Sequence, residues 1–243
     1  MISVVTRAGV KKEHSEDAVL CGAQVIVSEA CVASLPNNSF VAVADGVGGS
    51  LAGEVASTFV LSELSKCTPD DLRTQLLDIN NRLIAESNLI PEHKGMASTL
   101  TGVYLTKDES ILFHVGNTRA YTLQGKYLKQ ITSDHTVYNW LKSSGRHEEA
   151  AECNRNEITN CFGGGDPRLL ERLQVTTISS SKTVLLTSDG VHEHISIDDL
   201  EEILCMDLGD LEKCAAIIEK ALCAGSQDDL SVVLINASEE DEI

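Results

Sequence analysis

The distribution of apolar and polar residues predicts a chain of short strands and several helices. Apolar positions three to four residues apart predict helices over residues 51–66, 70–87, 137–144, 147–152, 198–205 and 208–222. Short runs rich in Val, Leu and Ile predict strands over residues 2–5, 18–27, 40–44, 99–106, 111–115, 119–123, 127–131, 173–178, 183–187 and 230–235. The four runs between residues 99 and 131 are typical of an antiparallel meander. This order favours an α+β fold with helices on the outer faces of antiparallel sheet.

The length and the linker signals predict one domain. The chain has 243 residues and only 4 prolines, and no Pro/Gly/Ser-rich linker divides it. We expect a single domain over residues 1–237. The remaining residues, 238–243 (SEEDEI), have little to bury, so we expect them to form a mobile acidic tail.

Charge and cysteine content restrict the possible partners and compartment. The chain carries 37 acidic and 19 basic residues, a formal net charge of −18, which repels nucleic acid and anionic lipid. No apolar run has the length of a membrane span, and the first residues do not resemble a secretion signal. The 8 cysteines include no CxxC pair, so we expect small core residues in a reducing cytoplasm.

Aspartates stand at the ends of several apolar runs. Asp45 follows FVAVA, Asp189 follows TVLLTS, Asp228 precedes LSVVLI, and Asp17 opens another run. Each Asp-Gly pair alone is more often an ordinary turn than a site. If the aspartates converge, however, burial and mutual repulsion would raise their pKa values, and a divalent cation would relieve both costs. Oxygen ligands suit Mg²⁺ or Mn²⁺, and the carbonyl of Gly46 is open to approach.

Eight segments together resemble the type 2C protein phosphatases, a family of metal-dependent Ser/Thr phosphatases, and most closely its bacterial branch. The segments follow the family's order over nearly the whole chain. They are SED (15–17), DGVGG with GEVAS (45–49 and 53–57), MASTL (96–100), HVGNTRAY (114–121), QITSDH (130–135), RNEIT (155–159), LTSDG (186–190) and SQDDLSVV (226–233).

The resemblance implies an αββα sandwich, in which two antiparallel β-sheets are flanked on both sides by helices. It also implies a site at one end of the sandwich. There Asp45 would bridge two Mn²⁺ or Mg²⁺ ions and the Gly46 carbonyl would bind one of them. Asp189 and Asp228 would hold the other ion. Asp17 and Glu16 would act through metal-bound water.

The activity implied by the resemblance is direct hydrolysis of phosphoserine and phosphothreonine in proteins. Two ions roughly 3.5–4 Å apart would lower the pKa of a bridging water or hydroxide and align it for attack on phosphorus. No covalent phosphoenzyme is needed, so the cysteines are not required as nucleophiles. We expect phosphorylated proteins as substrates, a cognate Ser/Thr kinase as partner, and a monomer.

Several positions depart from the family pattern, and three of them bear most directly on the site. Lys12 stands where the family has an arginine that holds the substrate phosphate, and lysine offers a point charge in place of a bidentate fork. Asn117 replaces an aspartate that helps to bind a third ion in bacterial members, which puts that ion in doubt. Asp229 replaces an asparagine and is either a spare ligand or a strand cap.

Two side chains near the expected site are expected to have no catalytic role. The stretch 136–156 corresponds to a flap that is thought to influence substrate choice in the family, and we expect Trp140 together with Leu141 to fill the core beneath it. His192 follows Asp189 closely, and a surface position at a helix start is the expectation for it.

Two other functions compete with catalysis. A catalytically weak or inactive pseudophosphatase that binds phosphoproteins or kinases is suggested by Lys12 and Asn117, whereas the retained aspartates argue against it. An acidic buffer for divalent ions lacks any EF-hand pattern.

Overall fold

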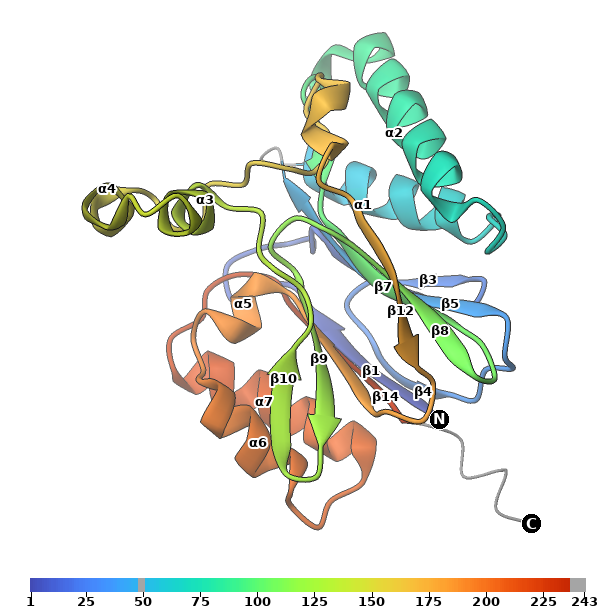
Figure 1. Cartoon of the computed structure of the whole chain (residues 1–243), viewed down its shortest axis with the longest axis vertical. Helices are drawn as coiled ribbons and strands as arrows, with labels where there is room; N and C mark the ends of the chain where they lie inside the picture. The colour runs from blue at the N-terminus through green and yellow to red at the C-terminus, as the bar shows by residue number, and fades with distance from the viewer. Residues whose placement is uncertain (48–50, 237–243) are drawn as a thin grey trace.

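The computed structural model describes residues 1–47 and 51–236, and of Leu51 only the backbone. Two antiparallel sheets face each other in it (Figure 1). In spatial order, the first sheet consists of β10 (Tyr127–Gln130), β9 (Arg119–Gln124), β13 (Val184–Thr187), β14 (Leu230–Ile235), β1 (Ile2–Arg7) and β4 (Ala30–Ala33). The second sheet consists of β11 (Phe162–Gly163), β6 (Ala97–Ser98), β5 (Ser39–Val47), β7 (Leu100–Leu105), β8 (Glu109–Val115) and β12 (Gln174–Ser179), and β2 (Asp17–Cys21) pairs with β5 and with β3 (Gln24–Ile26).

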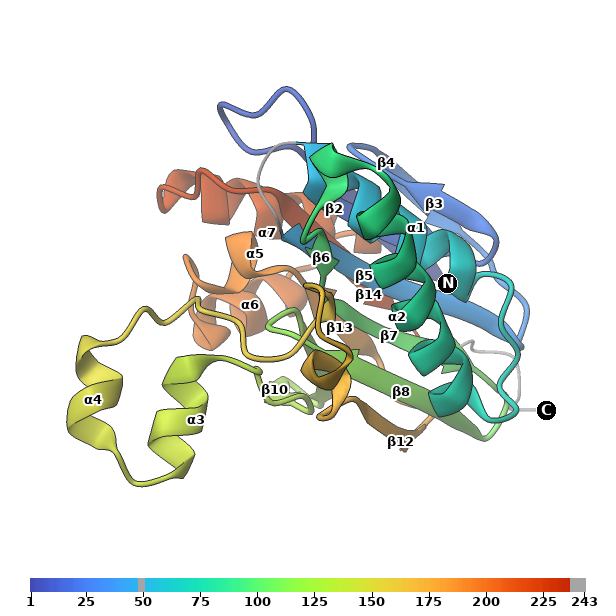
Figure 2. The ribbon, with the colours of Figure 1, turned by 90° about the horizontal axis from the view of Figure 1, so that it is seen from above.

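Helices cover the outer faces of both sheets. The second sheet is covered by α1 (Leu51–Leu64) and α2 (Leu72–Leu89), as Figure 2 shows from above. The first sheet is covered by α5 (Asp189–His192), α6 (Ile197–Leu204) and α7 (Asp210–Cys223). The remaining helices, α3 (Val137–Ser143) and α4 (His147–Glu152), project sideways from the sandwich in both views, and short 3₁₀ turns lie at Pro91–His93 and Pro167–Leu170. No helix in the described part of the chain has the length and apolarity needed to span a bilayer.

Three apolar layers explain why the central strands are apolar on both faces. In β5, Phe40 and Ala42 pack under α1 and α2, whereas Val41 and Val43 pack between the sheets. Along β14, the side chains likewise alternate between the layer beneath α6 and α7 and the layer between the sheets. Because side chains alternate in direction along a strand, such two-sided burial produces a continuous apolar run. The predicted αββα sandwich is confirmed.

Three details of the predicted strand pattern are wrong. Residues 18–27 form the hairpin β2–β3, which turns at Gly22 with a φ of +65°, and not one strand. The strand β5 continues through Asp45 to Val47, so Asp45 lies within a strand. The expected meander is divided between the sheets, since β7 and β8 belong to the second sheet and β9 and β10 to the first.

Gly116 marks the point where the chain changes sheets. Its φ is +107°, and a Cβ there would lie 2.6 Å from the Thr99 side chain. Glycine tolerates this conformation and this close approach at no steric cost. Two predicted features, the Gly48-Gly49 pair of the DGVGG segment and the acidic tail at 238–243, lie outside the described residues.

Candidate active site

The candidate site begins with a pair of aspartates on neighbouring strands. Asp17 on β2 and Asp45 on β5 are direct cross-strand partners. Val19, two residues after Asp17, and Val43, two residues before Asp45, pack between the two sheets. Because side chains two residues apart share a face, both carboxylates are directed between the sheets at one end of the sandwich. Like charges placed directly opposite each other destabilise a sheet unless something offsets them.

The main chain of Asp45 is fixed by the MASTL segment. The amide of Asp45 donates to Thr99 Oγ1 at 2.9 Å, and the amide of Thr99 donates to the carbonyl of Asp45 at 2.8 Å. The hydroxyl of Ser98 donates to the same carbonyl. Thr99 is a positioning residue that sequence reasoning included in a motif without giving it a role.

The other aspartates come from the facing sheet. Asp189 is the first residue of α5, directly after β13, and Asp228 precedes β14. The ends of these two strands are joined because the amide of Ser188 donates to the carbonyl of Ser231 at 3.1 Å, and the amide of Ser231 donates to Ser188 Oγ at 2.9 Å. Residues far apart in the sequence therefore meet at one end of the sandwich.

The electrostatics show how closely these carboxylates interact. Burial raises the pKa of Asp17 to about 8, with further contributions from the charges of Asp229 and Asp189. Burial also raises the pKa of Asp45 well above its usual value, and the charges of Asp189, Asp17, Asp228 and Asp229 act in the same direction. For Asp189, burial and the charge of Asp228 raise the pKa. Asp17, Asp45 and Asp189 thus resist ionisation because they are buried and because neighbouring carboxylates repel their charge.

Several buried acceptor oxygens at this end lack a hydrogen-bond partner. Neither carboxylate oxygen of Asp17 has one of ordinary geometry within residues 1–47 and 51–236, although Ser188 and Ser231 lie close enough to lower its pKa slightly. In the same described set, Glu16 Oε1 and Asn117 Oδ1 are also buried without a partner. Buried polar atoms without partners are rare and require a cause.

Gly53 brings two of the oxygens together. A Cβ on Gly53 would lie 2.2 Å from Glu16 Oε1 and 2.8 Å from the carbonyl oxygen of Gly46. The amide of Gly46 donates to the carbonyl of Glu16 at 3.0 Å, which holds the two segments side by side. The absence of a side chain at the start of α1 therefore leaves the Glu16 carboxylate and the Gly46 carbonyl adjacent.

Lys12 lies among the carboxylates. Its ammonium donates to Asp228 Oδ1 at 2.8 Å, to Asp229 Oδ2 at 2.9 Å and to Glu16 Oε2 at 3.1 Å. Burial disfavours the charged form, but these hydrogen bonds outweigh it and raise the pKa of Lys12. Asp229 also accepts the amides of Gly9 and Glu16, each at 2.8 Å, so it joins the loop before β2 to the start of β14.

Asn117 and His192 support the position of Asp189. The amide group of Asn117 donates to Asp189 Oδ2 at 2.8 Å. The His192 ring is hydrogen-bonded to Thr187 Oγ1 at 2.8 Å, and burial holds the pKa of His192 well below its usual value. The expectation of a surface position for His192 is wrong, because this side chain packs beneath the turn that carries Asp189.

The flap differs from expectation in one respect. Trp140 on α3 is 40% exposed, with the Arg146 guanidinium 5.2 Å from its ring centre, so it does not fill a core. Leu141 next to it is buried, as expected. The base of the flap is joined to the sandwich by Asn156, which donates to Glu193 Oε2 at 2.7 Å.

The donor set fits divalent cations. The converging groups are carboxylate, carbonyl and amide oxygens, the ligands that Mg²⁺ and Mn²⁺ prefer, and several of the oxygens lack other partners. Among the described residues, no three Asp, Glu, His or Cys side chains already meet around one point. Asp228 accepts a hydrogen bond from Lys12, and Asp189 accepts one from Asn117. These carboxylates would therefore have to reorient to share an ion.

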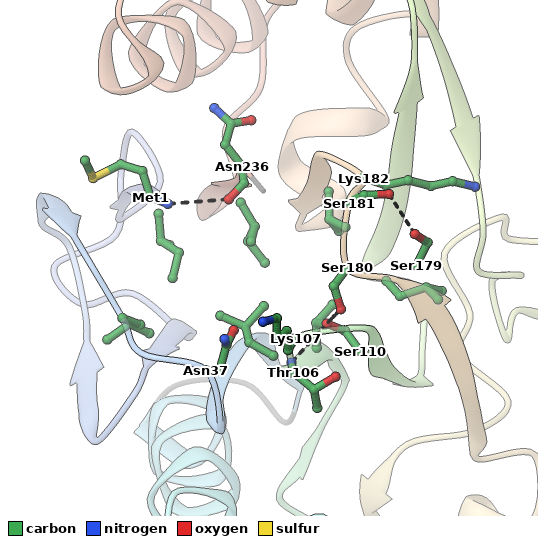
Figure 3. A pocket seen from close by; sticks show the side chains of 17 residues that line it. Met1, Asn37, Thr106, Lys107, Ser110, Ser179, Ser180, Ser181, Lys182 and Asn236 are labelled. Atoms are coloured by element: carbon green, nitrogen blue, oxygen red, sulfur yellow. Dashed lines mark hydrogen bonds between the residues drawn. The ribbon is translucent and has the colours of Figure 1, made fainter. Parts of the chain in front are cut away.

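A cavity of about 490 Å³ lies elsewhere, at the opposite end of the sandwich (Figure 3). It is lined by the far ends of β7, β12 and β14, including Leu105, Ile178 and Ile235, with Lys182 and several serines at its rim. The described residues around it include no carboxylate. The cavity therefore plays no part in the carboxylate site.

Comparison with known proteins gives a consistent result. The family "Protein phosphatase 2C" matches residues 29–224. Protein phosphatase PhpP of Streptococcus pneumoniae is 27% identical, covering 99% of this chain and 98% of that protein. Serine/threonine phosphatase stp of Listeria monocytogenes is 30% identical, covering 82% of this chain and 84% of that protein. Among solved structures, the catalytic domain of the serine/threonine protein phosphatase PstP in complex with two manganese ions is 28% identical, with a TM-score of 0.77 and 96% of each chain covered.

Proposed function

Because the chain belongs to the protein phosphatase 2C family, we propose that Asp45, Asp189 and Asp228 hold the metal ions with which it removes phosphate from proteins. The chain is a metal-dependent protein serine/threonine phosphatase, which acts on phosphoserine and phosphothreonine. Its cofactor is Mn²⁺ or Mg²⁺, and a related structure contains two manganese ions. The relatives that are named as phosphatases favour this function over a pseudophosphatase.

The observation that supports the assignment of residues is the convergence of Asp45 with Asp189 and Asp228 from the facing sheet, whose charges raise the pKa of Asp45 beyond the effect of burial. Asp45 is proposed to bridge two ions and the carbonyl of Gly46 to bind one of them. Asp189 and Asp228 are proposed to hold the other ion. When bound, the ions supply a water of lowered pKa as nucleophile and offset negative charge on the phosphoryl group.

The surrounding residues have supporting roles in this proposal. Asp17 and Glu16 would accept hydrogen bonds from metal-bound water, which would satisfy their free oxygens. Asn117 fixes Asp189 through its amide group, and because it is uncharged we do not assign a third ion. Lys12 places an ammonium at the partly exposed edge beside Asp228, where it would bind the substrate phosphate.

The test is phosphate release from a phosphothreonine peptide by metal-stripped protein with and without added Mn²⁺. We expect activity only with the metal. Asp45→Ala should reduce the rate by about 10²–10³-fold or more, the scale for losing one preorganised electrostatic contact. Asp198→Ala, in the exposed first turn of α6, is the matched control. Turnover by Asp45→Ala at the wild-type rate would disprove the assignment.

Further parts of the proposal concern the biological setting. The acidic protein is proposed to act in the cytoplasm, which suits its eight unpaired cysteines, all of which lie in the described part of the chain. We also propose a cognate Ser/Thr kinase as partner, a monomeric state, and residues 1–237 as one phosphatase domain. Co-purification with candidate kinases and light scattering would test the first two of these.

A further inference from the structure

Three donors of Lys12 are directed at three different carboxylates. An ammonium group has three N–H bonds and no acceptor, and the partners at 2.8, 2.9 and 3.1 Å use all of them. The side chain is about one-third exposed, so it lies at the edge of the carboxylate site and not on the open surface. Its charge is therefore used within the protein.

Asp229 determines where this ammonium lies. Its side chain is only 3% exposed, and its two oxygens accept the backbone amides of Gly9 and Glu16 as well as the ammonium of Lys12. An asparagine offers a single acceptor oxygen and could not accept all three donors. The unusual residues at positions 12 and 229 are thus two halves of one ion pair.

The partner at 2.8 Å is a proposed metal ligand. Asp228 is about half exposed, and the ammonium of Lys12 is the group that contacts its Oδ1 besides the backbone amide of Asp229. An ion held by Asp228 would lie next to the ammonium that already contacts this carboxylate. Two cations cannot share one carboxylate edge without repulsion, which is strong where water is partly excluded.

We propose that Lys12 is an internal counter-cation that competes with divalent ions for Asp228, and so weakens metal binding at that carboxylate. The proposal rests on the proposed function, since it takes Asp228 as a metal ligand. It also gives Lys12 two successive partners. While Lys12 contacts Asp228, all three of its N–H groups are held by carboxylates. Once an ion takes Asp228, the ammonium keeps Asp229 and Glu16 as partners, and its third N–H is available at the site edge to bind phosphate.

The test is calorimetric titration of metal-stripped protein with Mn²⁺, which does not depend on turnover. Lys12→Met removes the charge and keeps most of the length of the side chain, and Lys12→Arg keeps the charge. Lys11→Met is the matched control, because Lys11 is the exposed neighbour that no carboxylate of the site contacts in the described residues. We expect Lys12→Met to bind Mn²⁺ about tenfold more tightly than wild type, with Lys12→Arg and Lys11→Met close to wild type.

A second measurement protects the test against loss of structure. In EDTA, Lys12→Met should unfold at a lower temperature than wild type, because the carboxylates then repel one another without a counter-cation. Saturating Mn²⁺ should raise its unfolding temperature by more than it raises that of wild type. Circular dichroism at 20 °C shows whether the variant is folded, and Lys12→Gln replaces it if it is not.

The outcomes separate the two proposals. Equal or weaker Mn²⁺ affinity in Lys12→Met, with a wild-type protein that binds Mn²⁺ and hydrolyses a phosphopeptide, would overturn the counter-cation role alone. A wild-type protein that neither binds Mn²⁺ nor hydrolyses the peptide would overturn the proposed site itself.

Discussion

His114 should make the protein sensitive to mild acid, and this sensitivity can be calculated from its environment. The ring is completely buried, with Nδ1 2.8 Å from Thr101 Oγ1 and Nε2 3.1 Å from the carbonyl of Ser133. The carbonyl can only accept, so Nε2 donates and Nδ1 accepts from the threonine hydroxyl. Protonation would break this arrangement. Burial, together with the nearby His135, lowers the pKa of His114 to about 3.

The sign of the effect follows from comparing folded and unfolded chains. In the unfolded chain a histidine has a pKa near 6.5, so it binds a proton as the pH falls below that value, whereas folded His114 stays neutral until about pH 3. The contribution of His114 to stability is therefore complete above pH 6.5 and declines as the pH falls toward 3. The loss is about 1.36 kcal/mol for each pH unit below 6.5, and almost nothing is lost above that value. The loss between pH 7.5 and 5.5 is therefore about 1.3 kcal/mol.

The variant His114→Gln removes the titrating ring and keeps an amide that can form hydrogen bonds. We expect lower stability at pH 7.5, by about 1–3 kcal/mol for the imperfectly replaced hydrogen bonds. The difference from wild type should then shrink by about 1.3 kcal/mol at pH 5.5. Asp17 and other titrating groups are present in both proteins, so their effects cancel in the difference.

Urea unfolding in EDTA at both pH values, followed by far-ultraviolet circular dichroism, measures this difference. Tryptophan fluorescence is a poor signal here because Trp140 is partly exposed on the flap. The calculation is refuted if wild type and His114→Gln lose the same free energy of unfolding between pH 7.5 and pH 5.5.

Two further changes test the packing around the carboxylates. Gly53→Ala should weaken Mn²⁺ binding about tenfold or more, although alanine favours helix, because its Cβ would displace Glu16 and the Gly46 carbonyl. Calorimetric titration with Mn²⁺ measures the change in affinity. Ala52→Gly is the control, because it changes helix propensity without adding a group. Asn117→Asp would place a second carboxylate where an amide now donates to Asp189 at 2.8 Å, so the unfolding temperature in EDTA should fall by several degrees. Mn²⁺ should restore most of that loss, and equal unfolding temperatures of Asn117→Asp and wild type in EDTA would contradict the expected repulsion.

The strands that the sequence predicts well are those buried on both faces. The run 230–235 coincides with β14, and the apolar part of β5 was also found, because both faces of these strands pack against apolar layers. The division of the expected meander was not predictable from residues 99–131 alone. It depends on strands outside this segment, because β7 pairs with β5 and β9 pairs with β13, and the local pattern contains no information about those partners.

The same limit applies to single side chains. Asp45, Asp189 and Asp228 were candidates because each lies beside an apolar run, which is a local signal, and the family resemblance supplied the roles proposed for them. His192 was predicted at the surface and Trp140 in the core, and both predictions were wrong. The burial of these side chains depends on how α5 and the flap are placed. The role of Asp229 was left open between ligand and cap because its partner, Lys12, is 217 residues away.

The aspartates of the two sheets converge for the same reason that the sheets pack. Asp17 and Val19 share a face of β2, and Val19 packs in the layer between the sheets. A shift of one residue in the pairing of β2 with β5 would move the valines into the layer beneath the helices and would turn Asp17 away from the facing sheet. The free energy gained by burying the valines therefore also holds the carboxylates together against their repulsion. The metal site thus requires a stable sandwich. Repulsion among the clustered carboxylates lowers the free energy of unfolding until cations offset it.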